Sequence, residues 1–297
     1  MFSMKAPAIF IANPVAKGAS ERKIQKAITL LRSAGHEVSV YLTEKKGDAE
    51  DFAKNASKIS ESFIIAAGGD GTFNEVMNGI ANTDTKMAIL PMGTTNVLAK
   101  ELGIPEDVRG AINRALTGNV HSVSLGCIAF VRHASRVTRY FCLMAGIGFD
   151  GEAVYGVDES LKRCSGKGAY ILSGLKTLMK YSPEELTFIV NRNTYTGYSA
   201  IIGKASKYGG HFKITPDANL RDPHLSLFIM HGKRRRDILR YVYGIFMASH
   251  LTFRDITYLK ADSIRVEGNA RIQIDGDYLG TTPATITVVP HALRLVY

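Results

Sequence analysis

The sequence predicts two domains, a parallel α/β domain followed by a mainly antiparallel β domain. Short apolar runs alternate with amphipathic helical segments over the first ~120 residues, as in a parallel sheet with flanking helices. From Val123 onward the apolar residues recur at every second position, as in half-buried strands. The length of 297 residues is sufficient for two cores. We place the domains at residues 1–122 and 123–297.

The elements of the first domain follow from their apolar spacing and capping residues. Strands are expected at residues 8–12, 38–42, 63–67 and 87–90. Helices are expected to begin at caps or breaks near Ser20, Asp48, Thr72, Val97 and Val108. Thr72 and Glu75 have the spacing of a capping box, which predicts that the third helix starts there.

The second domain is predicted as a β-sandwich or curved sheet. Strands are expected at residues 138–143, 186–191, 195–202, 225–230, 263–266, 271–274 and 284–289, with one helical excursion at residues 158–180. Asn191-Arg192-Asn193 and Asp275-Gly276 are typical of hairpin tips.

The stretch from Phe63 to Glu75 predicts a phosphate site. A buried strand, a turn rich in glycine and a helix start aim free backbone N–H groups at an anion. Asp70 would repel a phosphate directly, so it suggests a divalent metal ion or its waters between the two. An ordinary α/β turn is the alternative. The motif matches neither the dinucleotide-binding nor the Walker-type glycine pattern.

Four polar loops are expected at one edge of the first sheet. They comprise residues 13–18, Thr43, residues 68–74 and residues 93–96, each after a predicted strand. Ligands of open α/β sheets bind at the carboxyl ends of the strands. Together the loops predict a nucleotide site.

Composition excludes several classes of protein. No apolar run approaches the length of a membrane span, and the three cysteines lack the spacing of a metal site or disulfide framework. The net charge of +10 fits an anionic partner, but no nucleic-acid-binding motif is present. The basic run at residues 233–236 precedes an apolar helical segment. That segment could lie on anionic lipid headgroups or face the core behind a solvated helix start, and the sequence leaves both open.

Several motifs together resemble the diacylglycerol kinase catalytic domain. In the first half they are Asn13-Pro14, residues 68–72 with Asn74-Glu75, and residues 91–94 with Asn96. In the second half they are residues 146–150, 161–163 with 166–170, 207–210, 216–218 and 274–277. The Gly-Gly-Asp-Gly-Thr motif is shared with NAD kinases, so the second-half motifs select the lipid branch. The chain resembles soluble bacterial lipid kinases of the diacylglycerol and sphingosine kinase superfamily over nearly its whole length.

The resemblance implies an NAD-kinase-like α/β domain, a β-sandwich domain and an active site in the cleft between them. It implies transfer of the γ-phosphoryl group of ATP to a lipid hydroxyl, with Mg²⁺. By motif, ATP would be held by Asn13, Thr43, Gly68, Gly69, Asp70, Gly71, Thr72, Phe73, Asn74, Glu75, Gly93, Thr94 and Asn96. The catalytic residues would be Asp70, Asp275 and Asp277. Asp70 would organise the metal, and the other two would supply a second metal-organising carboxylate and the base, in either assignment.

Three positions depart from the pattern that the resemblance implies. Asp277 stands where the family usually has Glu, which makes the expected base one methylene shorter. The segment that helps to bind a structural Mg²⁺ is Asp222-Pro223-His224-Leu225 here, so the metal would depend on Asp222 and the carbonyl of Leu225. His211 replaces a glycine.

We therefore expect an ATP- and Mg²⁺-dependent lipid kinase of phospholipid biosynthesis, with diacylglycerol as the first choice of acceptor. It would be cytoplasmic and visit the membrane surface transiently, without a nucleic-acid partner, and a homodimer is left open. One alternative is a related kinase acting on a sphingoid base, another glycerolipid or a soluble acceptor such as NAD. Another is a non-catalytic nucleotide or lipid sensor.

Overall fold

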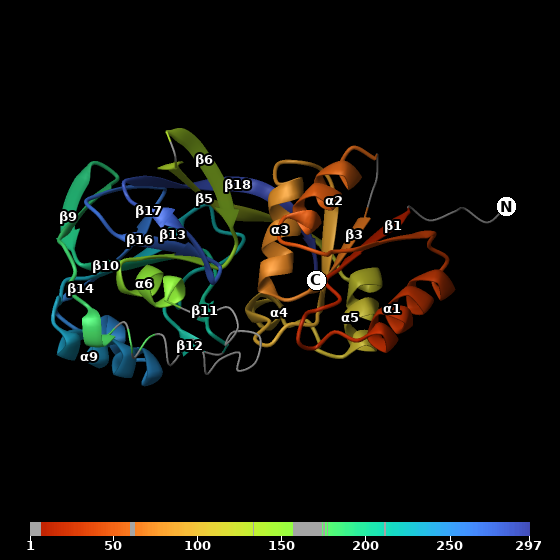
Figure 1. The fold of residues 1–297 in the computed structure, drawn as a ribbon, viewed down its shortest axis with the longest axis horizontal. Helices are drawn as coiled ribbons and strands as arrows, with labels where there is room; N and C mark the ends of the chain where they lie inside the picture. Colours follow the sequence, from red (N-terminus) through yellow and green to blue (C-terminus); the bar gives the residue numbers. More distant parts are fainter. Residues whose placement is uncertain are drawn as a thin grey trace. The chain divides into compact units, whose positions relative to one another are not determined.

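The chain forms two compact units. The computed structural model describes residues 7–59, 63–132, 134–156, 174, 176, 178–210 and 212–297. Unit 1 comprises Met1–Val123 together with His291–Tyr297, and unit 2 comprises Ser124–Pro290. The last seven residues of the chain thus return to the first unit (Figure 1).

Unit 1 is built on a parallel sheet. Its strands β1 (Ala8–Ala12), β2 (Val38–Leu42), β3 (Phe63–Gly68) and β4 (Lys86–Pro91) stand in the order β2-β1-β3-β4. Every residue of β1 and β3 is buried, which explains their continuous apolar sequences. The end of β18 (Ala284–Val296) adds a fifth, parallel strand, with Arg294 opposite Lys86 and Leu295 opposite Met87.

Helices cover both faces of this sheet. They are α1 (Glu21–Ser33), α2 (Asp48–Ala56), α3 (Asp70–Ile80), α4 (Val97–Glu101) and α5 (Val108–Thr117). Helix α2 packs against α3 on one face, and α1 packs against α5 on the other (Figure 1). The Ser20 cap of α1 is confirmed, since its hydroxyl accepts from the Lys23 N–H at 3.3 Å.

Two predicted helix starts in unit 1 are wrong. Helix α3 begins at Asp70, with Gly69 as an N-cap that has no side-chain hydrogen bond, so Thr72 and Glu75 do not form a capping box. Because Gly69 has no side chain, the residue before the helix offers no oxygen to cap the first N–H groups of α3. Asp48 does not cap α2 but is its first residue, and its Oδ2 accepts from the N–H groups of Glu44 and Lys45.

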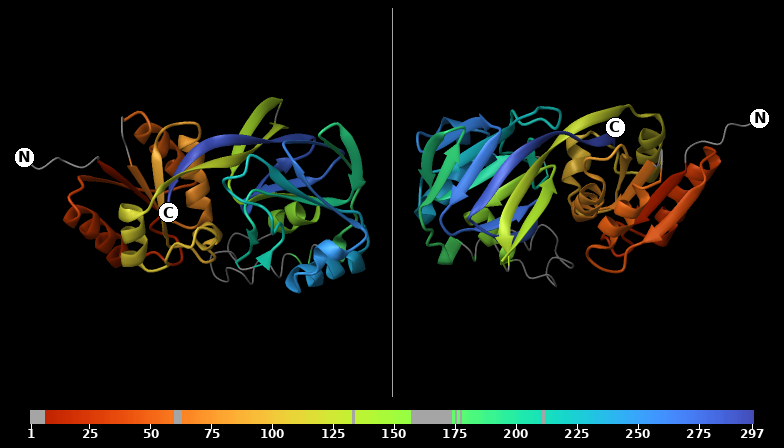
Figure 2. Two further views of the ribbon diagram at one scale, coloured as in Figure 1. Left: turned by 180° about the vertical axis from the view of Figure 1, so that it is seen from behind. Right: turned by 90° about the horizontal axis from the view of Figure 1, so that it is seen from above.

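Unit 2 contains two layers of antiparallel pairing. One holds β5 (Val120–Arg132), β6 (Ser135–Phe141), β8 (Leu186–Val190), β9 (Asn193–Gly197), β15 (Ser263–Glu267) and the start of β18. The other has the order β14 (Ile256–Ala261), β13 (Leu225–Met230), β10 (Ser199–Gly203), β7 (Met144–Ile147), β16 (Arg271–Ile274) and β17 (Asp277–Thr281). Buried side chains from both sets form one core, including Phe141, Phe188, Ile202, Leu227 and Ile264. Figure 2 shows the layers from two further sides.

Short elements complete unit 2. A two-stranded ladder joins β11 (Lys207–Tyr208) and β12 (Phe212–Lys213). Unit 2 also contains the helices α6 (Phe149–Tyr155), α9 (Arg235–Phe246) and η1 (His250–Thr252). Both predicted hairpin tips are confirmed. Asn191 with Arg192, and Asp275 with Gly276, have positive φ at both central positions, as in the tight turns that suit twisted strands.

Other expectations for unit 2 need correction. The predicted strand at residues 195–202 is two strands, β9 and β10, because the chain leaves one layer at Tyr198 and enters the other. Strands β14 and β17 and helix α6 were not predicted as elements. Of the helix predicted at residues 158–180, residues 174, 176 and 178–180 are helical, and the others lie outside the described residues. So do His211 and the motif at residues 161–170.

Candidate active site

The loops after the parallel strands lie side by side at one edge of unit 1, as the sequence predicted. The Asn13 N–H donates to the Ala67 carbonyl at 2.9 Å, and the Thr43 N–H donates to the Ala12 carbonyl at 2.9 Å. The Met92 N–H donates to the Gly68 carbonyl at 2.6 Å. Backbone bonds thus join the loops into one rim.

Two glycines allow the third and fourth loops to touch. A Cβ on Gly93 would lie 2.6 Å from the Gly69 Cα and 2.7 Å from Asn96 Oδ1, which no real side chain tolerates. Asn96 closes the second of these loops, since its Oδ1 accepts from the Gly93 N–H at 2.8 Å and its Nδ2 donates to the Gly93 carbonyl at 3.1 Å. The Asn96 side chain therefore shapes the rim.

Asp70 joins two helices of unit 1. Its Oδ2 accepts from the Val97 N–H and its Oδ1 from the Leu98 N–H, both at 3.0 Å, so that it holds the start of α4. Burial raises the pKa of Asp70, while these two N–H groups and the charge of Lys100 oppose the rise. Each carboxylate oxygen keeps a second lone pair, so the donor set still suits a metal ion or its waters.

The start of α3 divides the predicted ATP residues into two groups. Gly71 is exposed, and a Cβ placed there would meet nothing within 4 Å, so a ligand can approach the backbone closely. Thr94 is exposed as well, whereas Asn13 and Thr43 are half-buried. In contrast, Thr72 and Phe73 are buried in unit 1, and Asn74 accepts from Asn78. Thr72, Phe73 and Asn74 thus have contacts within unit 1, whereas Gly71 and Thr94 are accessible to a ligand.

Asp275 is tied to the backbone of unit 2. Its Oδ1 accepts from the Leu143 and Met144 N–H groups at 2.9 and 3.0 Å, and its Oδ2 accepts from the Cys142 N–H at 3.0 Å. Three successive amides facing one carboxylate fix the turn between β16 and β17. Asp277, the first residue of β17, follows this turn.

Asp150, in the motif at residues 146–150, is a buried carboxylate that was not among the predicted site residues. Its Oδ2 accepts from Gln273 Nε2 at 2.6 Å and its Oδ1 from the Tyr208 hydroxyl, and burial raises its pKa. Gln273 Oε1 in turn accepts from the Gly276 N–H at 2.8 Å, which connects Asp150 to the Asp275–Asp277 turn. An acidic residue after an apolar, glycine-containing run is the sequence signal that could have identified it.

An ammonium group occupies the carbonyl cluster at the predicted structural metal site. The buried Lys204 Nζ donates to the carbonyls of Asn219 at 2.5 Å and Asp222 at 2.7 Å, and more weakly to that of His224 at 3.4 Å. Burial lowers the pKa of Lys204 to about 8. The Asp222 carboxylate pairs with Lys260 Nζ at 3.2 Å, and Leu225 pairs with Ala261 in the β13–β14 ladder. These contacts do not fit a metal held by Asp222 and Leu225.

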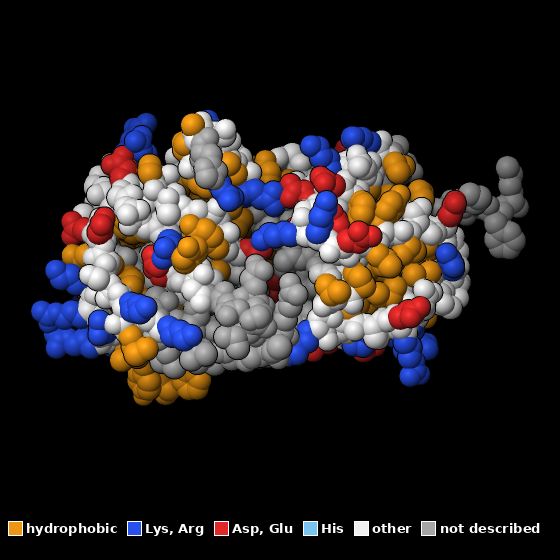
Figure 3. Space-filling view, viewed as in Figure 1, with side chains coloured by type: hydrophobic (Ala, Val, Ile, Leu, Met, Phe, Trp, Pro, Cys, Tyr) orange, Lys and Arg blue, Asp and Glu red, His pale blue; other side chains and the backbone are white. Residues whose placement is uncertain are grey.

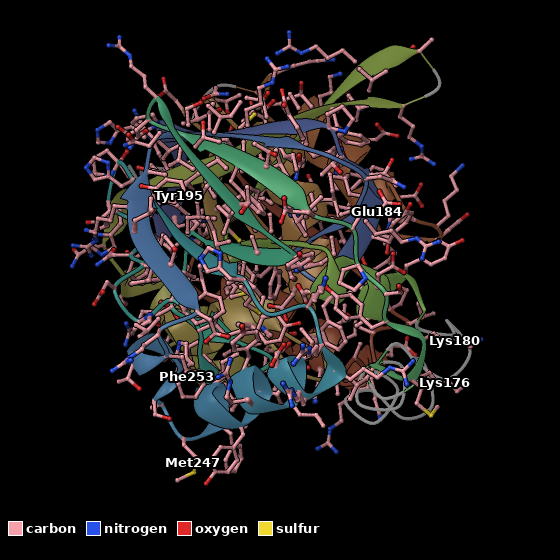
Figure 4. All side chains as sticks on the ribbon, turned by 90° about the vertical axis from the view of Figure 1, so that its left-hand side faces the viewer. Lys176, Lys180, Glu184, Tyr195, Met247 and Phe253 are labelled. Carbon is pink, nitrogen blue, oxygen red and sulfur yellow. The ribbon has the colours of Figure 1, made fainter. Side chains whose placement is uncertain are left out.

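Unit 2 also has a cavity of about 840 Å³ with a mixed lining. Tyr155, Met179 and Tyr181 contribute apolar surface, whereas Lys180 and Glu184 contribute charge. Figure 4 labels Lys180 and Glu184 on this side of the unit. Apolar and charged side chains therefore share the lining of this cavity.

The comparisons with known proteins agree with this geometry. The model of the diacylglycerol kinase catalytic domain matches residues 7–128, and that of the YegS C-terminal NAD kinase beta sandwich-like domain matches residues 144–297. A diacylglycerol kinase of Staphylococcus epidermidis (strain RP62A) is 31% identical over 288 residues, which are 95% of this chain and 89% of that protein. The chain belongs to the diacylglycerol kinase family.

Other relatives and solved structures extend the likeness. A diacylglycerol kinase of Staphylococcus aureus (strain JH9) has the same identity and coverage, 31% over 95% of this chain and 89% of that protein. A solved diacylglycerol kinase of Bacillus anthracis str. Sterne is 21% identical with a TM-score of 0.70, over 98% of this chain and 96% of that one. Yeast NADH kinase complexed with NADH is 11% identical with a TM-score of 0.53, over 98% and 83%. This family is one of kinases, and its members use ATP.

Proposed function

We propose that the chain transfers the γ-phosphoryl group of ATP to the free hydroxyl of diacylglycerol, giving phosphatidic acid. The observation that carries the proposal is the likeness to diacylglycerol kinases at 31% identity, which extends over 95% of the chain and therefore over both units. The names of those relatives give diacylglycerol as their acceptor, and we propose the same acceptor for this chain.

The rim of unit 1 supports the nucleotide half of the proposal. The exposed Gly71 at the start of α3 and the joined loops around Gly93 would hold the triphosphate, with Asn13, Thr43 and Thr94 at the accessible positions. A Mg²⁺ ion, when bound, would neutralise charge on the transferring phosphoryl group. Asp70 is the residue of unit 1 that we propose to organise it, since one or two carboxylates plus phosphate oxygens are the usual Mg²⁺ ligands.

The Asp275–Asp277 turn supports the acceptor half. Asp275 accepts three backbone N–H groups and so has the character of a fixed support. We assign Asp277 as the base that accepts the proton of the lipid hydroxyl. A carboxylate next to a rigid turn is held in position for proton transfer, even though Asp is one methylene shorter than the Glu that is usual in the family.

The test is a phosphorylation assay with product identification. Purified protein, γ-labelled ATP, Mg²⁺ and mixed micelles containing diacylglycerol should give labelled phosphatidic acid. Asp277→Asn should lower turnover by about a hundredfold or more, and a melting curve verifies that the variant is folded. Labelling of a sphingoid base or of NAD in preference to diacylglycerol would show that diacylglycerol is not the acceptor. ATP binding without turnover on any of these acceptors would instead favour a non-catalytic nucleotide or lipid sensor.

A further inference from the structure

Helix α9 has an apolar face toward solvent as well as one toward the core. Leu239, Val242, Tyr243, Phe246 and Met247 are each between 53% and 65% exposed. Their spacing of i, i+3, i+4, i+7 and i+8 places them on one face, which we call the outer stripe. A surface helix ordinarily turns polar residues to solvent, and a contiguous exposed apolar patch marks an interaction site.

The opposite face attaches α9 to unit 2 without the outer stripe. Ile238, Tyr241 and Gly244 are buried, and a Cβ on Gly244 would lie 2.5 Å from the Phe253 ring. The Tyr241 hydroxyl donates to Asp255 Oδ2 at 2.6 Å and accepts from the Gly232 N–H at 2.8 Å. In Figure 4, Phe253 lies on the inner side of the helix, whereas Met247 projects away from the ribbon. The buried face therefore anchors α9 to unit 2.

A cluster of basic side chains stands at the start of the same helix. Lys233, Arg234, Arg235 and Arg236 are all exposed. One acidic group touches this cluster, since Asp237 Oδ1 lies 4.0 Å from Arg236 Nε while its Oδ2 accepts from the Arg234 N–H at 3.0 Å. The other nearby acid, Asp255, pairs with Arg240. Figure 3 shows hydrophobic side chains projecting at the position of α9, with Lys and Arg side chains beside them.

An aromatic side chain from another element extends the stripe. Phe212 of β12 is 43% exposed, and its ring centroid lies 5.5 Å from that of Phe246. Aromatic rings combined with basic residues are typical of segments that lie in the interface of a bilayer, where the rings enter the acyl boundary and the cations meet phosphates.

We propose that the outer stripe of α9 and its basic cluster dock unit 2 on an anionic lipid bilayer. The charge of the cluster and the net charge of +10 favour an anionic surface over a second copy of this chain, which would carry the same charge. This docking surface does not rest on the kinase chemistry, because the helix would bind the bilayer without nucleotide or acceptor.

The experiment measures binding to vesicles in the absence of ATP. Sedimentation with vesicles of phosphatidylcholine that contain roughly a third phosphatidylglycerol should capture the wild-type protein, and added NaCl should weaken capture. Pure phosphatidylcholine vesicles should bind it about tenfold less well. Equal binding to both lipids, without salt dependence, would overturn the proposal.

Two double variants separate the apolar and charged contributions. Tyr243→Ser with Phe246→Ser, and Arg235→Glu with Arg236→Glu, should each weaken binding to the anionic vesicles by about tenfold or more. Two exposed residues at the C-terminal end of β5 provide matched controls. Val131→Ser, at a side chain that is 66% exposed, is the control for the apolar variant, and Arg132→Glu is the control for the charge variant. Both controls should bind like the wild type. Melting temperatures verify the fold, and Met247→Ser is the milder variant if one double variant unfolds.

Two outcomes would contradict the assignment of the surface. Wild-type binding by both double variants would show that α9 does not face the bilayer. Loss of a dimer in gel filtration by the stripe variant, with unchanged vesicle binding, would make a second copy the occupant. Turnover on a short-chain, monomeric diacylglycerol separates failure of the docking proposal from failure of the proposed function. The docking variants and the wild type should turn this substrate over equally. If the proposed function is wrong, neither the variants nor the wild type will turn it over.

Discussion

Asp275, two residues before Asp277, accepts three backbone N–H groups. Asn at position 275 would retain only one acceptor oxygen for the N–H groups of Cys142, Leu143 and Met144. We expect Asp275→Asn to lower the free energy of unfolding by about 1–3 kcal/mol. Chemical denaturation measures the loss. Unchanged stability of Asp275→Asn would show that the three bonds do not hold the turn.

Lys204 predicts how the protein responds to removal of metal. Since an ammonium satisfies the carbonyls of Asn219 and Asp222, a chelator should leave the melting temperature of the nucleotide-free protein unchanged. Lys204→Met would leave buried carbonyls unsatisfied and should lower the free energy of unfolding by about 2–4 kcal/mol. Lys260→Met removes only the partly exposed pair with Asp222 and should cost under about 1 kcal/mol. A fall in the melting temperature on adding chelator would contradict this and support a structural metal ion at Asp222 and Leu225.

At the scale of elements, the rim of unit 1 depends on the contact between Gly69 and Gly93. Gly93→Ala should weaken ATP binding by about tenfold or more and lower the melting temperature, because its Cβ would stand 2.6 Å from Gly69 Cα. Gly71→Ala has open space around its Cβ, so it should keep the melting temperature and lose ATP affinity, since the methyl blocks the approaching phosphate. Calorimetric titration with ATP tests both. Wild-type ATP affinity in Gly71→Ala would show that the phosphates of ATP do not bind at the start of α3.

The sequence predicted elements best where one local signal determined them. The strands of unit 1, the Ser20 cap and both hairpin tips follow from apolar runs, one hydroxyl and residues that accept positive φ. The capping box at Thr72 failed because Gly69 had already started the helix. The contacts of Asp70, Asp275 and Lys204 reach groups between 15 and 133 positions away, and no local pattern reports such pairings.

The sequence also left the orientation of α9 open, because both of its faces are apolar. The buried Ile238 and Tyr241 and the exposed Val242 and Phe246 are all apolar or aromatic. The charged residues of the helix lie in its first half, so the apolar second half does not show from the sequence which side faces solvent. The structure shows that the segment both packs on unit 2 and presents apolar groups to solvent.

At the scale of the whole molecule, β18 makes unit 1 depend on the end of the chain. Its first part pairs with β15 in unit 2, and its last part pairs with β4 in unit 1. The Asn82 N–H also donates to the Ala292 carbonyl at 2.7 Å. The two paired strands are about 200 residues apart in the sequence, so this pairing is highly non-local. Unit 1 is therefore discontinuous in sequence.

Leu295→Ala tests this dependence. Leu295 is 1% exposed and lies opposite Met87, so its truncation should lower the free energy of unfolding by about 2–4 kcal/mol. Hydrogen exchange should become faster in β3 and β4, next to the joined loops of unit 1, while β10 and β13 of unit 2 keep their protection. Arg294→Ala is the control, because it removes an exposed pair with Asp84 and should change stability by less than about 1 kcal/mol. Faster exchange confined to β18 itself would show that unit 1 folds without its last strand.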